Sequence, residues 1–181
     1  VRVLRLIAVP AGRAIDRFNS GKTNAVIGGK FEDFPLAAAT SLSRGAIRLD
    51  PVAGLFGLVF AHDDGFFSQP GNREAIAMAI DRETIAEAMG IGGWVPTTRI
   101  VQPAAQDDIG TIGERWTGLG LAARREVAKA RVLQWRAGNR DPVRIRIAFP
   151  AGPGADKLFA QLARDLEQIG LAAVRTSESG V

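Results

Sequence analysis

Apolar runs with strand-like spacing alternate with runs of helix-like spacing along this chain, and this alternation restricts the fold class most. Residues 143–149 carry apolar side chains at every second position with arginines between them, which predicts a half-buried strand. The run 155–169 repeats apolar residues at helical spacing and is followed by Gly170, so it predicts a helix with a glycine cap. Residues 171–175 predict one more strand.

The first part of the chain predicts further strands. Residues 1–9 and 24–27 read as strands on either side of a helix over 11–19, and a strand, helix and strand this close together indicate a βαβ unit. The nearly unbroken apolar run 55–61 predicts a strand covered on both faces in the middle of a sheet. We therefore expect an α/β fold with a mixed sheet and flanking helices.

Three more helices are predicted in the centre of the chain. They cover residues 68–80, 82–89 and 125–137, and Asp81 is placed to cap the second of them. Glycines and prolines are frequent in residues 91–120, which we interpret as a long connection over the surface.

Composition excludes several classes of function. The chain has no cysteine, which excludes thiol catalysis, cysteine-ligated zinc and iron–sulfur clusters. A net charge of +4 without basic clusters that contain exposed aromatics argues against a nucleic-acid partner. No apolar run approaches the roughly 18 residues of a membrane span.

The chemical motifs are few. His62, Asp63 and Asp64 follow the predicted strand 55–61, and α/β sheets bind ligands at strand ends, although a polar turn explains the same residues. Adjacent residues on an extended backbone diverge, so we expect no metal there. The glycine clusters 90–93 and 152–154 do not match phosphate-binding loops, so no cofactor is predicted.

One segment matches a known family in register. Residues 66–85 resemble the signature of the extracellular solute-binding proteins of family 5, the peptide- and nickel-binding proteins of ABC importers, with matches at Arg73, Ala75, Ala79, Ile80, Asp81, Arg82 and Ile85. The flanks agree more weakly, since Asn24 stands where the family usually has Asp and Ala61 where it usually has Asn. The resemblance covers almost the whole chain.

The resemblance implies that residues 1–181 are a single lobe, most of the second lobe, of a two-lobed class II periplasmic-binding-protein-like fold. The expected partners are a peptide or similar small solute, an ABC permease in the membrane and the first lobe of the same chain. The expected location is periplasmic or otherwise extracytoplasmic. The family's Trp-x-x-Asp-Tyr segment, whose acidic residue meets the ligand's ammonium in many members, would lie beyond Val181.

Within this frame the candidate residues have different roles. Arg73, Asp81 and Arg82 are expected to serve the structure, the two arginines by reaching carboxylates of neighbouring elements. Solute contact is expected at His62, Asp63 and Asp64, or at Trp94, where an aromatic face could cover a ligand.

Two other functions stay open. A small α/β hydrolase-like enzyme could use His62, although no Gly-x-Ser-x-Gly occurs. A ligand-sensing domain of a transcription regulator is the third possibility, because such lobes are reused there.

Overall fold

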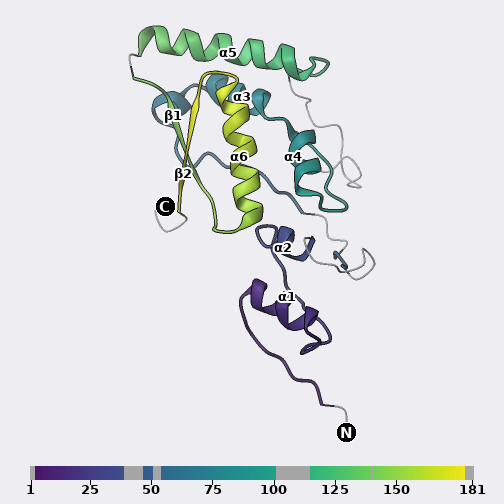
Figure 1. The fold of residues 1–181 in the computed structure, drawn as a ribbon. Helices are drawn as coiled ribbons and strands as arrows, with labels where there is room; N and C mark the ends of the chain where they lie inside the picture. The colour runs from purple at the N-terminus through teal and green to yellow at the C-terminus, as the bar shows by residue number, and fades with distance from the viewer. Residues whose placement is uncertain (1–2, 39–46, 51–53, 101–114, 140, 178–181) are drawn as a thin grey trace.

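The computed structural model of the chain describes residues 3–38, 47–50, 54–100, 115–139 and 141–177. Six α-helices, one 3₁₀-helix and two strands lie within those ranges (Figure 1). In chain order they are α1 (Ala11–Asn19), α2 (Phe34–Ala38), the 3₁₀-helix η2 (Gly65–Ser68), α3 (Pro70–Ala79), α4 (Arg82–Met89), α5 (Leu121–Gly138), β1 (Arg144–Ala148), α6 (Pro153–Glu167) and β2 (Ala172–Thr176).

The two strands and the helix between them form a βαβ unit. β1 and β2 pair in parallel, with Arg144 opposite Ala172 at one end and Ala148 opposite Thr176 at the other. The strands predicted over 143–149 and 171–175 are confirmed. The predicted mixed sheet is wrong for the part of the chain that is described, because its sheet is this parallel pair alone.

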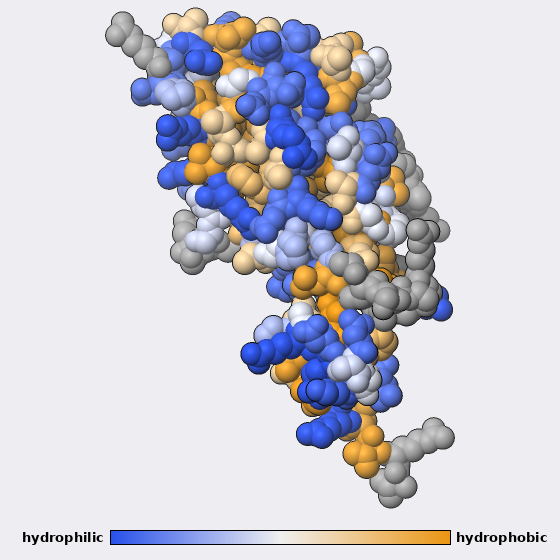
Figure 2. Space-filling view, viewed as in Figure 1, coloured by the Kyte–Doolittle hydropathy of each residue, from blue (hydrophilic) through white to orange (hydrophobic). Residues whose placement is uncertain are grey.

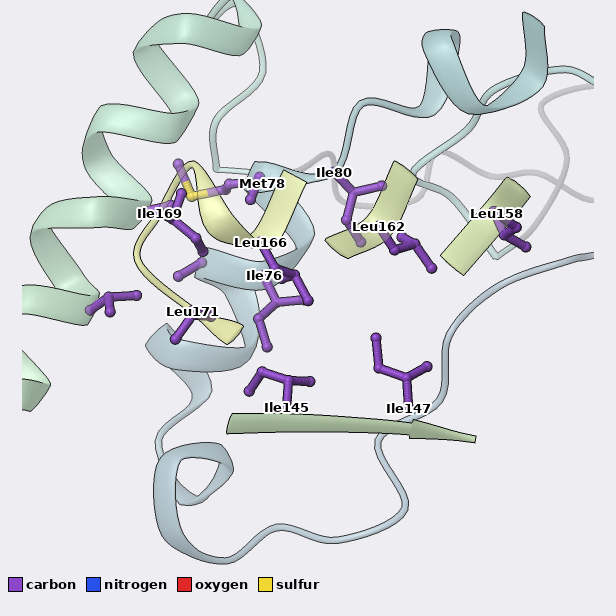
Figure 3. Close-up of a cluster of buried hydrophobic side chains, with 14 of the residues drawn as sticks. Ile76, Met78, Ile80, Ile145, Ile147, Leu158, Leu162, Leu166, Ile169 and Leu171 are labelled. Atoms are coloured by element: carbon purple, nitrogen blue, oxygen red, sulfur yellow. The ribbon is translucent and has the colours of Figure 1, made fainter. Parts of the chain in front are cut away.

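The hydrophobic core lies between β1, α6 and α3 (Figure 3). β1 alternates as its sequence predicts, with Ile145 and Ile147 buried and the arginines exposed. The facing stripe of α6 and its continuation are buried through Leu158, Leu162, Leu166 and Ile169. The helix predicted over 155–169 is therefore confirmed, and it begins two residues earlier because Pro153 suits the first turn.

Helix α5 lies across one end of the molecule and packs along α3 (Figure 1). The two helices run antiparallel, since Arg131 of α5 reaches the start of α3 at Gly71 and Arg125 reaches its end at Ala79. Buried alanines on both helices allow close contact. The predicted helices over 68–80, 82–89 and 125–137 are confirmed, and α5 begins four residues earlier than expected.

The first two helices form an arm that extends from the main body, which we call the N-terminal arm (residues 3–38). Helix α1 packs against α2, and α2 packs against α6 (Figure 1). The helix predicted over 11–19 is confirmed at both ends, and Gly21 adopts the left-handed conformation after it. None of the side chains of α1 is buried.

Three predicted strands are wrong where the chain is described. Residues 3–9, 24–27 and 55–61 have no strand structure, and their apolar side chains are exposed, by 83% at Leu4 and 90% at Val59. A strand requires a neighbour for its main-chain hydrogen bonds. No described segment lies beside these three in a sheet, so their strand-like composition alone does not produce one.

Candidate functional site

A groove of about 400 Å³ opens beside the carboxyl end of β1, and we call it the strand-end groove. Its wall comes from three distant parts of the chain, namely residues 30–32, 56–58 and 148–150. Ligands of α/β proteins commonly bind outside the carboxyl ends of parallel strands. The groove thus lies at a strand end, but the strand is β1 and not the predicted strand 55–61, and the residues that line it are different from those predicted.

Two glycines position residues 30–32 against α6. The Gly154 N–H donates a hydrogen bond of 2.8 Å to the Glu32 carbonyl oxygen. A Cβ on Gly152 would lie 2.9 Å from that oxygen, and a Cβ on Gly154 would overlap the Phe31 carbonyl oxygen. Gly152 also has a φ of +143°, which favours glycine. The glycines of 152–154 thus serve a close approach of two main-chain segments.

Aromatic side chains line and border the groove. The rings of Phe31 and Phe56 are 4.8 Å apart, and Trp94 stacks on Phe56 with a separation of 5.4 Å and an interplanar angle of 25°. Phe56 is 48% exposed and Trp94 is half-buried. The aromatic face predicted at Trp94 is therefore present beside the groove, and its contact with a solute stays a prediction.

One carboxylate lines the groove. Glu32 is only 8% exposed, and its Oε1 lies 3.6 Å from the Lys30 Nζ. This ion pair is the only side-chain interaction that the described part of the chain shows for the Glu32 carboxylate. Lys30 itself is 76% exposed, so the pair is open to water on the lysine side. Sequence reasoning missed Glu32 because nothing in residues 30–33 signals burial.

His62, Asp63 and Asp64 lie elsewhere. All three are exposed in the irregular segment before η2, and they do not line the strand-end groove. No side-chain hydrogen bond or ion pair is found for them within the ranges described. The strand that should have presented them at a sheet edge does not form, so the structure does not assemble the predicted cluster into a site. Their contact with solute stays a prediction.

The motif residues Asp81, Arg73 and Arg82 hold helix ends. Asp81 caps α4 as predicted, since its carboxylate accepts hydrogen bonds from the Thr84 N–H at 3.0 Å and the Thr84 hydroxyl at 2.7 Å. Arg82 donates to the carbonyl oxygens of Ala77 and Ile80 at 3.0 and 3.3 Å, where α3 ends.

Arg73 donates to the Phe67 carbonyl oxygen in the η2 turn. The expected partners of Arg73 and Arg82 were carboxylates, and the partners shown here are main-chain carbonyls. Helix ends leave such carbonyls without intrahelical partners, and an arginine can reach several of them.

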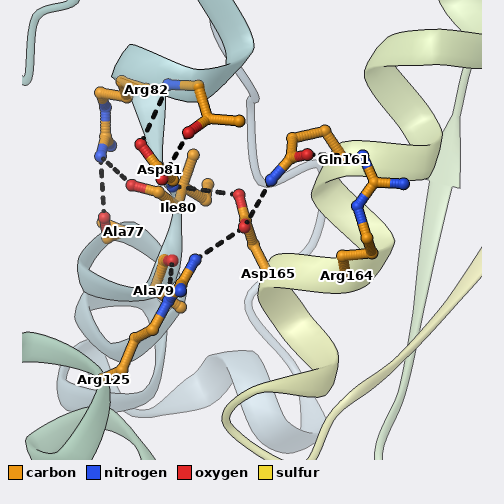
Figure 4. A network of polar contacts seen from close by, with 10 residues as sticks. Ala77, Ala79, Ile80, Asp81, Arg82, Arg125, Gln161, Arg164 and Asp165 are labelled. Atoms are coloured by element: carbon orange, nitrogen blue, oxygen red, sulfur yellow. Dashed lines mark hydrogen bonds and ion pairs between the residues drawn. The ribbon is translucent and has the colours of Figure 1, made fainter. Parts of the chain in front are cut away.

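Asp165 joins three elements in a buried polar network (Figure 4). Its carboxylate accepts hydrogen bonds from Arg125 of α5 at 2.7 Å, from the Asp81 main-chain N–H at 3.0 Å and from Gln161 at 2.9 Å. Burial raises the pKa of the Asp165 carboxyl, although these three donors oppose the shift. This network was missed from the sequence because its members are 40 or more residues apart, except Gln161.

Asp81 has the opposite shift. Burial would raise the pKa of the Asp81 carboxyl, but the hydrogen bonds from Thr84 and the nearby charges of Arg125 and Arg124 outweigh it, so the pKa is lowered. Asp81 and Arg82 thus connect the start of α4 to α6 and α3, and the nearby charges of Arg124 and Arg125 come from α5.

A second groove of about 440 Å³ lies between the start of α3 and the end of α5. Amide side chains and Trp135 line it, together with Arg131. The guanidinium of Arg131 is 2.6 Å from a Glu74 oxygen, so its charge is already neutralised. The described residues that line this second groove include no carboxylate.

A βαβ unit with a groove at the strand ends is typical of α/β proteins that bind small solutes. This chain belongs to the bacterial extracellular solute-binding proteins of family 5: the family's middle region matches residues 4–178. No curated protein and no solved structure matches the chain. Members of this family are non-enzymatic proteins that bind solutes outside the cytoplasm, and the resemblance stated from residues 66–85 is confirmed.

None of the helices in the described ranges is both long and apolar enough to cross a membrane. Across the same residues no group of three or more histidine or acidic side chains is arranged to hold a metal ion.

Proposed function

We propose that this chain is one lobe of the substrate-binding component of an ABC importer. It would capture a peptide or a similar small solute by closure of two lobes and present it to a membrane permease. Its expected location is the periplasm, or another extracytoplasmic position in association with the membrane. The family match over residues 4–178 carries this proposal. The first lobe of the same polypeptide is the expected second half of the site.

The strand-end groove is the surface that we assign to the solute. It combines apolar side chains with one carboxylate, which is the usual composition of a small-molecule site. The groove is open, so a solute bound there would be covered on one side only. Closure by a second lobe would enclose it and would exclude water.

The hydrolase alternative gains no support from the structure. His62 is exposed, and no hydrogen bond of its imidazole to a nucleophile or a carboxylate is found in the part of the chain that is described. A catalytic base of the triad type needs both contacts. We therefore propose a binding protein rather than an enzyme.

Binding can be tested by thermal unfolding and calorimetry with di- and oligopeptides, sugars and metal chelates. We expect one class to raise the unfolding midpoint, with an affinity near about 1 mM because one lobe supplies only part of the contacts. Phe56→Ser should abolish the effect, whereas Val59→Ser, which changes a neighbouring side chain outside the groove, should leave it intact. Absence of any shift, or ester or peptide hydrolysis that His62→Ala removes, would contradict the proposal.

A further inference from the structure

We propose that the strand-end groove selects solutes that carry a protonated amine on a compact apolar body, with Glu32 as the anionic contact. This inference rests on the proposed function, because it assigns a solute class to the same groove. It depends on three observations, which are the state of Glu32, the position of Lys30 and the aromatic lining.

Glu32 is a largely buried residue whose carboxylate has one described side-chain partner. It is 8% exposed, and an ionised carboxylate can accept about four hydrogen bonds. The Lys30 Nζ at 3.6 Å is beyond hydrogen-bond distance and is its only described side-chain partner. The Glu32 carboxylate oxygens are not among the described buried polar atoms that lack a partner, so they still reach water and retain capacity for a cation that brings N–H donors.

The ammonium group of Lys30 lies near the Glu32 carboxylate, so a solute ammonium could occupy the same position. Its side chain is flexible and 76% exposed, and ion pairs of this kind contribute little because solvent screens them. A solute ammonium can therefore displace the Lys30 ammonium into water at small cost. Lys30 would then compete with the solute, so its removal should strengthen binding.

The rest of the lining suits an apolar body. Phe31, Phe56, Leu58, Phe149 and Pro150 face or border the groove, and Trp94 extends this surface through its stack on Phe56. Aromatic faces attract cations as well as apolar groups. The volume of about 400 Å³ has room for a body such as a phenyl ring with a short chain.

Charge argues against anionic solutes. Among the described residues of the lining, Lys30 is the only cationic side chain, and it is paired with Glu32. A solute carboxylate in the groove would lie near the Glu32 carboxylate. The described lining has no second cation that would offset this repulsion. Neutral apolar solutes would leave Glu32 unsatisfied, because the water around it would be displaced.

The experiment compares three probes of similar size by calorimetry on the whole chain, namely 2-phenylethylammonium, 2-phenylethanol and 3-phenylpropionate. We expect the ammonium to bind at least about tenfold more tightly than the other two, as a charge-assisted contact provides. Glu32→Gln should remove this preference, and Lys30→Met should strengthen ammonium binding. Glu83→Gln, which changes an exposed carboxylate on α4, should change nothing.

The outcomes separate this inference from the proposed function. Equal binding of the three probes, or an unchanged preference in Glu32→Gln, overturns the amine site, while peptide binding that Phe56→Ser removes would still support the receptor. Circular dichroism checks the fold of Glu32→Gln, whose main-chain carbonyl can still accept from Gly154. If that variant does not fold, Lys30→Met decides, because weaker or equal ammonium binding in it also overturns the inference.

Discussion

Asp165 is the ionisable side chain with the least exposure among the residues described, at 1%. Its neighbours are a guanidinium, a main-chain N–H and an amide, and each donates one hydrogen bond. A buried ion pair gives little net stability over an apolar substitute, but the loss of one partner is costly because the other charge stays poorly solvated. The value of the network is thus that it joins α5, α6 and the start of α4 in one arrangement.

Asp165→Ala should lower the free energy of unfolding by about 3–5 kcal/mol, because Arg125 and the Asp81 N–H lose their shared acceptor. Asp165→Asn keeps one oxygen acceptor but removes the charge and replaces the other acceptor with a donor, so it should cost less than Asp165→Ala without being neutral. Urea denaturation of both variants at neutral pH measures the difference. Similar, small effects of the two substitutions would show that the network does not contribute to stability.

Asp81 should make stability depend on pH in the acid range. Its pKa is lowered in the folded state, so the unfolded chain binds more protons between that pKa and the ordinary value of 3.8. The free energy of unfolding therefore rises with pH through this window, and the contribution of Asp81 is lost as pH falls through its folded-state pKa. The raised pKa of Asp165 acts in the opposite direction, above 3.8.

Asp81→Ala should cost about 1 kcal/mol at pH 7, the typical effect of removing an N-cap. The cost should shrink as the pH falls from 3.8 through the lower pKa of the folded state, where the native carboxylate also becomes protonated. Asp81→Asn is the matched control, since asparagine caps helices well and should retain most of the stability. Denaturation series at several pH values test this, and a pH-independent cost would refute the charge contribution.

Two helices of this chain begin with the same Pro-Gly pair in different surroundings. In α3 the pair is Pro70-Gly71, and a Cβ on Gly71 would meet nothing within 4 Å. In α6 the pair is Pro153-Gly154, where the Phe31 carbonyl oxygen occupies the position of a Cβ. The local sequence does not explain why glycine is present at position 71 or at position 154. At position 154 the reason is the packing of the N-terminal arm against α6.

Gly154→Ala should destabilise the chain by about 1–3 kcal/mol and displace residues 30–32, since overpacking forces a main-chain shift. Gly71→Ala should be neutral or stabilising by up to about 1 kcal/mol, because alanine favours helix. Thermal unfolding gives the stabilities, and ammonium binding at the strand-end groove reports the position of Glu32. Equal effects of the two substitutions would contradict the close approach.

Apolar side chains cover parts of the surface of the whole molecule, including the narrow N-terminal arm in Figure 2. Leu4, Leu6, Leu55 and Val59 are exposed by 83%, 76%, 58% and 90%. Exposed apolar surface on this scale favours association between copies or with other polypeptide. These side chains contribute little to the core of the chain itself.

Leu6→Lys combined with Val59→Lys should reduce self-association and leave the unfolding midpoint nearly unchanged, within about 0.5 kcal/mol. Ile169→Lys, at a position with no exposure, should prevent folding and serves as the contrasting control. Sedimentation velocity and thermal unfolding measure the two effects. A large loss of stability in the surface variant would show that the exposed segments belong to the folded core.

Local patterns in the sequence predicted α1, α3, α4, α5, α6 and the two paired strands, whereas α2 and η2 were not predicted. The signals for α1, α4 and α6 are local, since they depend on apolar periodicity, on a cap such as Asp81 and on glycines with positive φ after the helix. The alternation in 143–149 predicted both β1 and its buried face. This prediction succeeds because the partner strand β2 and the covering helix α6 follow β1 directly in the sequence.

Which of the other apolar runs form strands, and where the groove lies, depends on contacts between segments that are distant in the chain. Residues 3–9, 24–27 and 55–61 have the composition of strands, but a strand exists only beside a partner, and the partner is not a local property. Glu32 became a candidate in the same way, since its burial depends on Gly154 and on residues 56–58 and 148–150. Periodicity reports the surroundings of one segment, whereas a site is made by contacts between segments that are far apart in the chain.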